Sequence, residues 1–211
     1  LAADIEVHPA SSTSVGNCIP FGGWSPVSNS GSYRYTGFIY KNIPAFDLLP
    51  GDTISFDLGK ANDVTIEMDI ALAATTSNGG DQESSAGFTT VVNAGTPSDP
   101  DGNNTSGDYE LVFTVDTAFS FAGGGLIIRF DSTGSFGNDT DCTQVLVQTT
   151  SSDSSGYFVR RFYYETDGGY PWGGSSTGAL GGFEITFAYW YADGDGDGYG
   201  DASTSYQGTS P

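Results

Sequence analysis

The chain has 211 residues, with 26 acidic side chains against 6 basic ones and a formal net charge of −20. So acidic a surface repels phosphate groups, which excludes nucleic-acid binding and attachment to anionic membranes through basic residues. Aromatic residues make up 14% of the chain, and because disordered chains are poor in aromatics we expect a buried core. No apolar run approaches the roughly 18 residues that span a bilayer, so the sequence predicts no membrane insertion.

The first 17 residues are polar and contain one short alternation, Ile5-Glu6-Val7. We interpret residues 1–17 as an N-terminal arm, either loose or able to add a strand to the open sheet edge of another subunit. No basic segment followed by an apolar stretch opens the chain. We therefore expect that any signal peptide has already been removed.

After Cys18, short runs of alternating apolar and polar residues recur between turn signals, a pattern typical of β-strands. The clearest run is 64–72, and Leu49-Pro50-Gly51-Asp52 is typical of a turn. In that run the residues predicted to face a core are Val64, Ile66, Met68, Ile70 and Leu72. The predicted strands are 33–40, 53–58, 64–72, 88–92, 109–115, 126–130, 143–149, 157–164 and 183–191.

The strand pattern predicts an all-β fold of about ten strands, an antiparallel β-sandwich or jelly roll with a C-terminal Asp/Gly calcium loop. A barrel remains open, but a parallel α/β fold is excluded because no segment has the helical periodicity of crossover helices. We expect three parts: the arm 1–17, a β-sandwich domain 18–191 and a metal-binding motif 192–211. The motif would leave directly from the last strand of the domain.

That motif contains acidic residues at alternate positions, Asp193-Gly-Asp195-Gly-Asp197-Gly-Tyr199-Gly-Asp201. Calcium takes six to eight oxygen ligands, and a twelve-residue calcium loop supplies them from positions 1, 3, 5, 7 and 9. These positions fall on Asp193, Asp195, Asp197, the main-chain oxygen of Tyr199, and Asp201. Position 12 is Thr204, where a helical calcium hand has a bidentate Glu. The alternative is a flexible acidic linker.

The run from Tyr191 to Asp201 resembles the MopE-type metal-binding repeat, and it is similar to the Asp-rich calcium repeats of thrombospondin type 3 modules. The resemblance covers residues 191–211. It implies a metal-binding role for Asp193, Asp195, Asp197 and Asp201, and a place in a large secreted or surface-attached protein. The chain lacks the Asn/Asp-Cys-Asp segment into which these repeats usually continue.

The chain has two cysteines, Cys18 and Cys142. In an exported protein they would most simply form a disulfide, and chain entropy gives a loop of this length roughly 4–5 kcal/mol of stabilisation. The alternative is two unpaired buried thiols.

Catalytic groups are scarce, because the single histidine, His8, lies in the polar arm. A Ser-His-Asp or Cys-His site would need that residue to reach the core, and one histidine with two cysteines is too few for a structural zinc site. Two carboxylates are enough for a glycosidase. Candidates alternate with apolar residues on predicted strands and should face water: Glu67, Asp69, Glu110, Glu165 and Glu184. We therefore expect no enzyme.

These features predict a secreted or cell-surface structural protein that binds Ca²⁺ and associates with itself or with other surface proteins, as a subunit of a fibre, sheath or adhesin. The alternative is a carbohydrate-binding jelly-roll module of a larger secreted protein. In that case the rings of Trp24, Tyr170 and Trp172, which lie in Gly/Pro-rich segments, would stack on sugars. The other role for the two tryptophans is to fill the ends of the core.

Overall fold

The computed structural model describes residues 3–7, 13–16, 33–56, 58–60, 68–75, 87–96, 111–132, 145–149, 156–165, 182–191 and 205–207. In these ranges the chain forms strands and no helix, and every strand pair is antiparallel. The predicted all-β, antiparallel class is confirmed for this part of the chain. Accordingly, it contains no helix long and apolar enough to cross a membrane.

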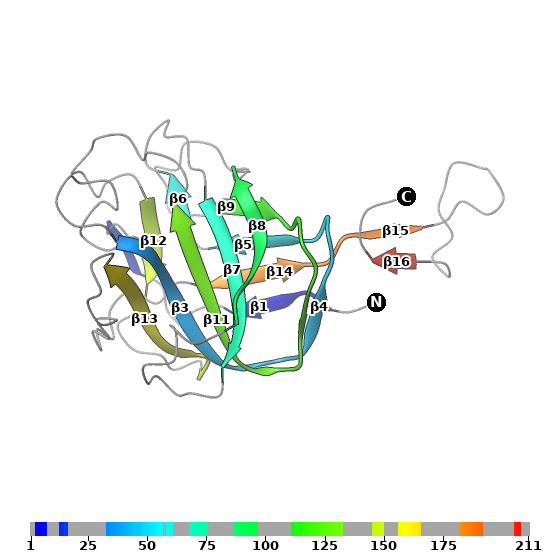
Figure 1. Ribbon diagram of the computed structural model, residues 1–211, viewed down its shortest axis with the longest axis horizontal. Helices are drawn as coiled ribbons and strands as arrows, with labels where there is room; N and C mark the ends of the chain where they lie inside the picture. The colour runs from blue at the N-terminus through cyan, green and yellow to red at the C-terminus, as the bar shows by residue number, and fades with distance from the viewer. Residues whose placement is uncertain are drawn as a thin grey trace.

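Two larger sheets form the body of the molecule (Figure 1). The four-stranded sheet has the order β1 (Ile5–Val7), β14 (Phe183–Thr186), β5 (Thr53–Phe56) and β9 (Leu111–Thr114). The five-stranded sheet has the order β13 (Phe158–Glu165), β3 (Tyr33–Ile43), β11 (Gly124–Ser132), β7 (Met68–Thr75) and β8 (Thr89–Gly95).

Three smaller sheets complete the described strands. One has the order β2 (Thr13–Gly16), β12 (Val145–Thr149) and β6 (Leu58–Lys60). A second pairs β10 (Phe119–Phe121) with β4 (Phe46–Leu48), and a third pairs β15 (Tyr189–Tyr191) with β16 (Ser205–Gln207). The described residues thus hold sixteen strands rather than about ten, because several have three residues, too few for an alternation to be recognised.

The inner faces of the two larger sheets share one hydrophobic core. Phe56 of β5 meets Phe130 of β11 with ring centroids 4.8 Å apart. Tyr40 of β3 meets Phe183 of β14, also at 4.8 Å. Both contacts are close to edge-to-face, the arrangement that aromatic quadrupoles favour. Because each pair joins one sheet to the other, these rings hold the two layers together.

The clearest predicted strand is 64–72, and its described part, residues 68–72, is a strand as predicted. β7 begins at Met68, and Met68, Ile70 and Leu72 are buried in the shared core as predicted. The intervening Ala71 and Ala73 are buried as well, so β7 is covered on both faces and small residues occupy its second face. Val64 and Ile66 lie outside the described residues.

Part of the segment predicted as an N-terminal arm belongs to the chain's own sheets. Ile5 and Val7 are buried in the core, and β1 is the edge strand beside β14. Thr13–Gly16 forms β2 and pairs with β12. In this structure the paired strands of the arm are therefore not available as donors to another subunit. The short alternation Ile5-Glu6-Val7 matches the alternate burial of side chains along β1.

Candidate functional site at the base of the Asp/Gly loop

The predicted calcium ligands Asp193, Asp195, Asp197, Tyr199 and Asp201 lie outside the described residues, so the ligand set stays a prediction. Among the residues that the structure does describe, no group of three or more His, Cys, Asp or Glu side chains is arranged to hold a metal ion. The donor set in the sequence consists of oxygens alone. Oxygen donors suit a hard cation such as Ca²⁺, whereas zinc sites are usually built with Cys or His.

The strands on either side of the Asp/Gly segment pair with each other. In the β15–β16 ladder, Tyr189 is opposite Gln207, Trp190 is opposite Tyr206, and Tyr191 is opposite Ser205. Directly opposed residues of antiparallel strands have Cα atoms about 5 Å apart. The residues 192–204 therefore start and end at one pair of strand residues, and the acidic segment is the connection of a β-hairpin.

The hairpin leaves the body of the molecule through a break in the predicted strand 183–191. β14 ends at Thr186 and β15 begins at Tyr189. Between them the main-chain N–H of Phe187 donates to Asp4 Oδ1 at 3.3 Å, and that of Ala188 donates to Asp52 Oδ1 at 2.8 Å. These two N–H groups bond to side chains, so the strand changes partners here and the hairpin extends beyond the two sheets (Figure 1).

Asp52 is the central polar residue of this junction, and it is fully buried. Its Oδ2 atom accepts a hydrogen bond from the Leu49 main-chain N–H at 2.8 Å, and its Oδ1 atom accepts the one from Ala188. The main chain of Asp52 also bonds, with its N–H to Leu49 O at 3.0 Å and its oxygen accepting from Val115 N–H at 2.8 Å. A buried carboxylate is tolerable only when donors replace its lost hydration, as they do here.

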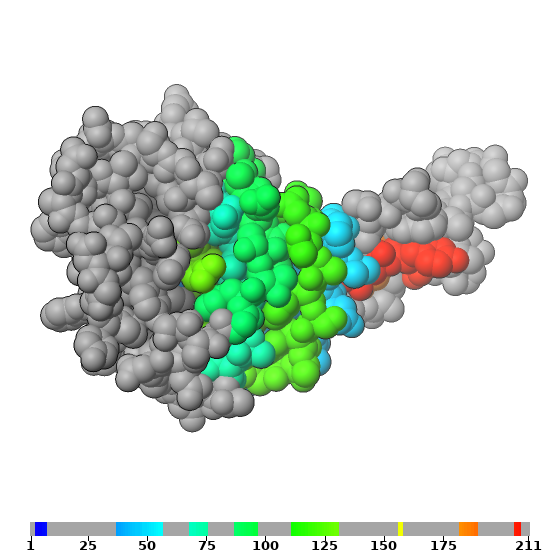
Figure 2. Space-filling view, in the orientation of Figure 1, coloured from blue at the N-terminus to red at the C-terminus, as the bar shows by residue number. Residues whose placement is uncertain are grey.

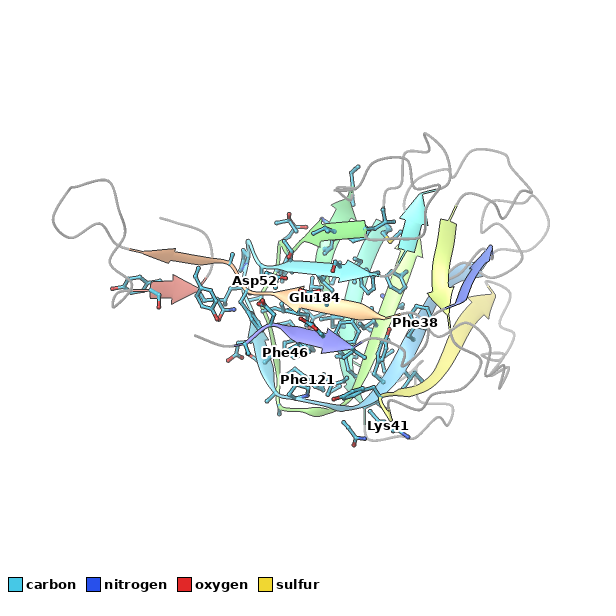
Figure 3. The ribbon with its side chains drawn as sticks, turned by 180° about the vertical axis from the view of Figure 1, so that it is seen from behind. Phe38, Lys41, Phe46, Asp52, Phe121 and Glu184 are labelled. Carbon is cyan, nitrogen blue, oxygen red and sulfur yellow. The ribbon has the colours of Figure 1, made fainter. Side chains whose placement is uncertain are left out.

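The turn 49–52 explains how Asp52 reaches this position. The sequence predicts a turn at Leu49-Pro50-Gly51-Asp52, and the bond from Asp52 N–H to Leu49 O confirms it. Gly51 has a φ of 98°, which only glycine adopts readily, and Pro50 supplies the fixed φ of the preceding position. The turn closes at the start of β5, and this points the Asp52 carboxylate towards the base of the hairpin (Figure 3).

Gln207, the last residue of β16, completes the junction. Its side-chain amide Nε2 donates to Asp52 Oδ2 at 2.7 Å and to the main-chain oxygen of Asp47 at 2.8 Å. Figure 2 shows the residues of β16 against the part of the surface formed by residues around β4. The second strand of the hairpin is thus bonded to the buried carboxylate that also accepts the N–H of Ala188, the residue just before the first strand. Asp52 and Gln207 are the functional candidates that sequence reasoning missed.

The other candidate residues divide between described and undescribed parts of the chain. Trp24, Tyr170, Trp172, Cys18, Cys142, His8, Glu67 and Glu110 lie outside the described residues, and for Glu165 only the strand position in β13 is described. The carbohydrate-binding alternative therefore stays a prediction. The disulfide also stays a prediction. The strands next to the two cysteines in sequence, β2 and β12, pair with each other, and Gly16 is opposite Leu146.

The two remaining carboxylates of the enzyme hypothesis have structural partners. Asp69 is half-buried, and its Oδ1 accepts the main-chain N–H of Ala94 at 2.6 Å. Ala94 has a φ of 47° at an irregularity in the β7–β8 pairing, so this bond holds a strained residue in place. Glu184 accepts the hydroxyl of Thr186 at 3.2 Å. Asp69 and Glu184 belong to different sheets.

A groove runs beside the junction, with a volume of about 520 Å³. It is lined by residues 3–7 of the β1 segment, by residues 44–47 at the start of β4, and by Tyr157, Phe187 and Gln207. It therefore lies next to the edge strand β1 and the foot of the hairpin.

Comparison with known protein families and with curated protein sequences finds no match to this chain.

Proposed function

We propose that this protein is a secreted, calcium-binding structural protein that acts as a subunit of an extracellular or cell-surface assembly. In this proposal, two parts of the chain have different roles. The body is a rigid β-domain, and the Asp/Gly hairpin is a projecting element whose shape depends on calcium. No catalytic step is part of this function.

We also propose that the domain is a β-sandwich with jelly-roll topology. Two antiparallel sheets that share a core with crossing aromatic contacts support a β-sandwich. We propose jelly-roll connectivity for it, because strands adjacent in a sheet come from distant parts of the sequence, as in β14 beside β5 and β13 beside β3. Tyr189, the first residue of β15, packs against this core. The hairpin is therefore attached to the domain by side-chain packing as well as by hydrogen bonds.

The observation that carries the proposal is the closed base of the Asp/Gly segment, where Tyr191 lies opposite Ser205. A loop whose two ends are already held together loses less entropy when it closes around an ion than a free tail does. In the proposed site Asp193, Asp195, Asp197, Asp201 and the main-chain oxygen of Tyr199 would hold one Ca²⁺. The ion would supply positive charge within a segment whose carboxylates otherwise repel one another.

The anchoring of both ends of the hairpin to Asp52 supports the structural role. The Ala188 N–H and the Gln207 amide bond to the two oxygens of one buried carboxylate. An ordered loop at the tip would therefore be rigidly connected to the body, so that it can present a defined surface to a neighbouring subunit. The net charge of −20 makes contacts between subunits unfavourable unless cations intervene, and this also favours calcium as the agent of assembly.

The experiment is to measure particle size by light scattering and electron microscopy, first in millimolar calcium and then after addition of a chelator. We expect ordered particles in calcium that dissociate on chelation. The Asp197→Ala variant should fail to form particles while its circular dichroism spectrum remains that of a folded β-protein. Monomers of the wild-type protein under both conditions would refute the assembly role.

A further inference from the structure

The edge of the four-stranded sheet at β1 has the geometry of a strand-accepting site. In the described part of the chain, β1 pairs with β14 and has no second strand neighbour. The groove of about 520 Å³ lies beside β1, and all five residues from Ala3 to Val7 line it. Figure 3 shows β1 between β14 and the labelled Phe46, which lines the other side of the groove. An edge strand of this kind offers main-chain N–H and C=O groups to an added strand.

The charged side chains that line the groove are all acidic. Asp4, Glu6 and Asp47 line it with exposed side chains, and no Lys, Arg or His is among its lining residues. Glu6 is also directly opposite Glu184 in the β1–β14 ladder. Like charges in directly opposed positions destabilise a strand pair. A cation bound beside Glu6 would relieve that repulsion.

The walls of the groove are suited to an extended chain. Among its lining residues, Phe46 and Phe187 are buried and Tyr157 is half-buried. These apolar groups lie beside acidic ones, so a strand with alternating basic and apolar side chains would match both. A second copy of this chain is a poor occupant, because with a charge of −20 it would add acidic groups to an acidic groove.

We propose that the β1 edge and its groove accept an extended, basic segment of another protein, which adds a strand beside β1 and places Lys or Arg side chains next to Glu6 and Asp47. This names the partner chemistry for the assembly role proposed above and rests on that role. It does not involve the calcium loop. The N-terminal segment then acts as an acceptor of a strand, with β1 already supplied by its own chain.

The test uses a seven-residue peptide of alternating Lys and Val with both termini blocked. Its binding to the 211-residue chain is measured in calcium-containing buffer by calorimetry and by hydrogen exchange. Two control peptides are needed. One alternates Glu and Val, and the other is the Lys–Val peptide with N-methyl groups on alternate residues, which removes its strand hydrogen bonds but retains its charge. The protein variants are the pair Glu6→Gln/Asp47→Asn and the control pair Asp116→Asn/Thr117→Lys. Both pairs change the net charge by +2, and the control pair follows β9, the opposite edge of the same sheet.

We expect the Lys–Val peptide to bind and to slow amide exchange in residues 3–7. Affinity should fall about tenfold in the groove variant, from two lost surface ion pairs, and should be unchanged in the control variant. The Glu–Val and N-methylated peptides should not bind.

Three results would overturn the proposal. The first is evidence that the peptide is attracted to the acidic surface in general. Either an equal loss of affinity in both variants or binding without slower amide exchange at residues 3–7 would show this. The second is equal binding of the Lys–Val and Glu–Val peptides. The third is dimerisation of the protein through residues 3–7 without peptide. If the protein still forms calcium-dependent particles but does not bind the peptide, only this inference is refuted. If it binds the peptide but forms no particles, only the assembly role is refuted.

Discussion

Gln207 donates hydrogen bonds from one amide nitrogen to Asp52 Oδ2, at 2.7 Å, and to the main-chain oxygen of Asp47, at 2.8 Å. The two side chains are 155 positions apart in the sequence. The bond to Asp52 connects β16 to the turn that precedes β5. It makes the hairpin around the Asp/Gly segment part of the folded body.

Replacement of Gln207 by alanine should detach β16 without unfolding the body of the molecule. The variant loses two hydrogen bonds, one of them to a carboxylate, which should cost about 1–2 kcal/mol locally. We expect faster amide exchange in Tyr189–Tyr191 and Ser205–Gln207, with little change in the melting temperature. The control is Tyr206→Phe, in the same strand, where the ring is 50% exposed and exchange should stay slow. Unchanged exchange in Gln207→Ala would show that the ladder alone holds the hairpin.

Asp52→Ala should be far more damaging than Gln207→Ala. It removes the acceptor of two main-chain N–H groups, those of Leu49 and Ala188, in a fully buried position. Each buried donor left unpaired costs about 1–3 kcal/mol, so we expect a loss of roughly 3 kcal/mol in the free energy of unfolding. Urea denaturation measures this directly. A loss below that of Gln207→Ala would mean that water replaces the carboxylate, and that Asp52 is not the anchor.

Ala94 offers a test of backbone strain. Its φ of 47° is in the left-handed region, which costs an L-residue roughly 1–2 kcal/mol. We therefore expect Ala94→Gly to raise the free energy of unfolding by about 1 kcal/mol. At Ala118, an exposed residue that is not among those with positive φ in the described ranges, the same change should lower it by about 0.5–1 kcal/mol. Equal effects at the two positions would remove strain as the explanation.

The register of β2 and β12 leads to a prediction about the two cysteines. Gly16, two residues before Cys18, is opposite Leu146, four residues after Cys142. We expect the two thiols to be joined in a disulfide, so that the mass of the intact chain increases by two hydrogens on reduction. Reduction should lower the free energy of unfolding by up to roughly 4–5 kcal/mol. Labelling of both thiols by iodoacetamide in the unreduced, denatured protein would contradict the pairing.

The sequence predicts those features whose signal is local. The alternation of Met68, Ile70 and Leu72 identifies the core face of β7, because side chains on a strand alternate between two faces. The turn at Leu49-Pro50-Gly51-Asp52 follows from the backbone preferences of proline and glycine. The apolar and polar alternation of Ile5-Glu6-Val7 is equally local, yet three residues among polar neighbours are too few to predict β1 with its partner β14.

The site itself depends on long-range contacts, which a single sequence does not reveal. The run 183–191 reads as one strand because apolar and aromatic residues continue through it. It divides at Phe187 and Ala188 because Asp4 and Asp52, both distant in sequence, accept the hydrogen bonds of those two residues. In the same way, nothing near Asp52 or Gln207 in the sequence indicates that one binds the other. The composition of the Asp/Gly segment predicts its chemistry, but not that a strand pair closes its base.

Calorimetric titration of calcium into the chelator-treated protein measures whether the hairpin binds one calcium ion through its alternating aspartates. We expect one site per chain with a Kd of about 10⁻³ M or tighter, in the range of extracellular calcium modules. The Asp197→Ala variant should bind at least about tenfold more weakly, since a charged ligand is lost. A titration without a saturable site, or an affinity that Asp197→Ala leaves unchanged, would show that these aspartates do not form a calcium site.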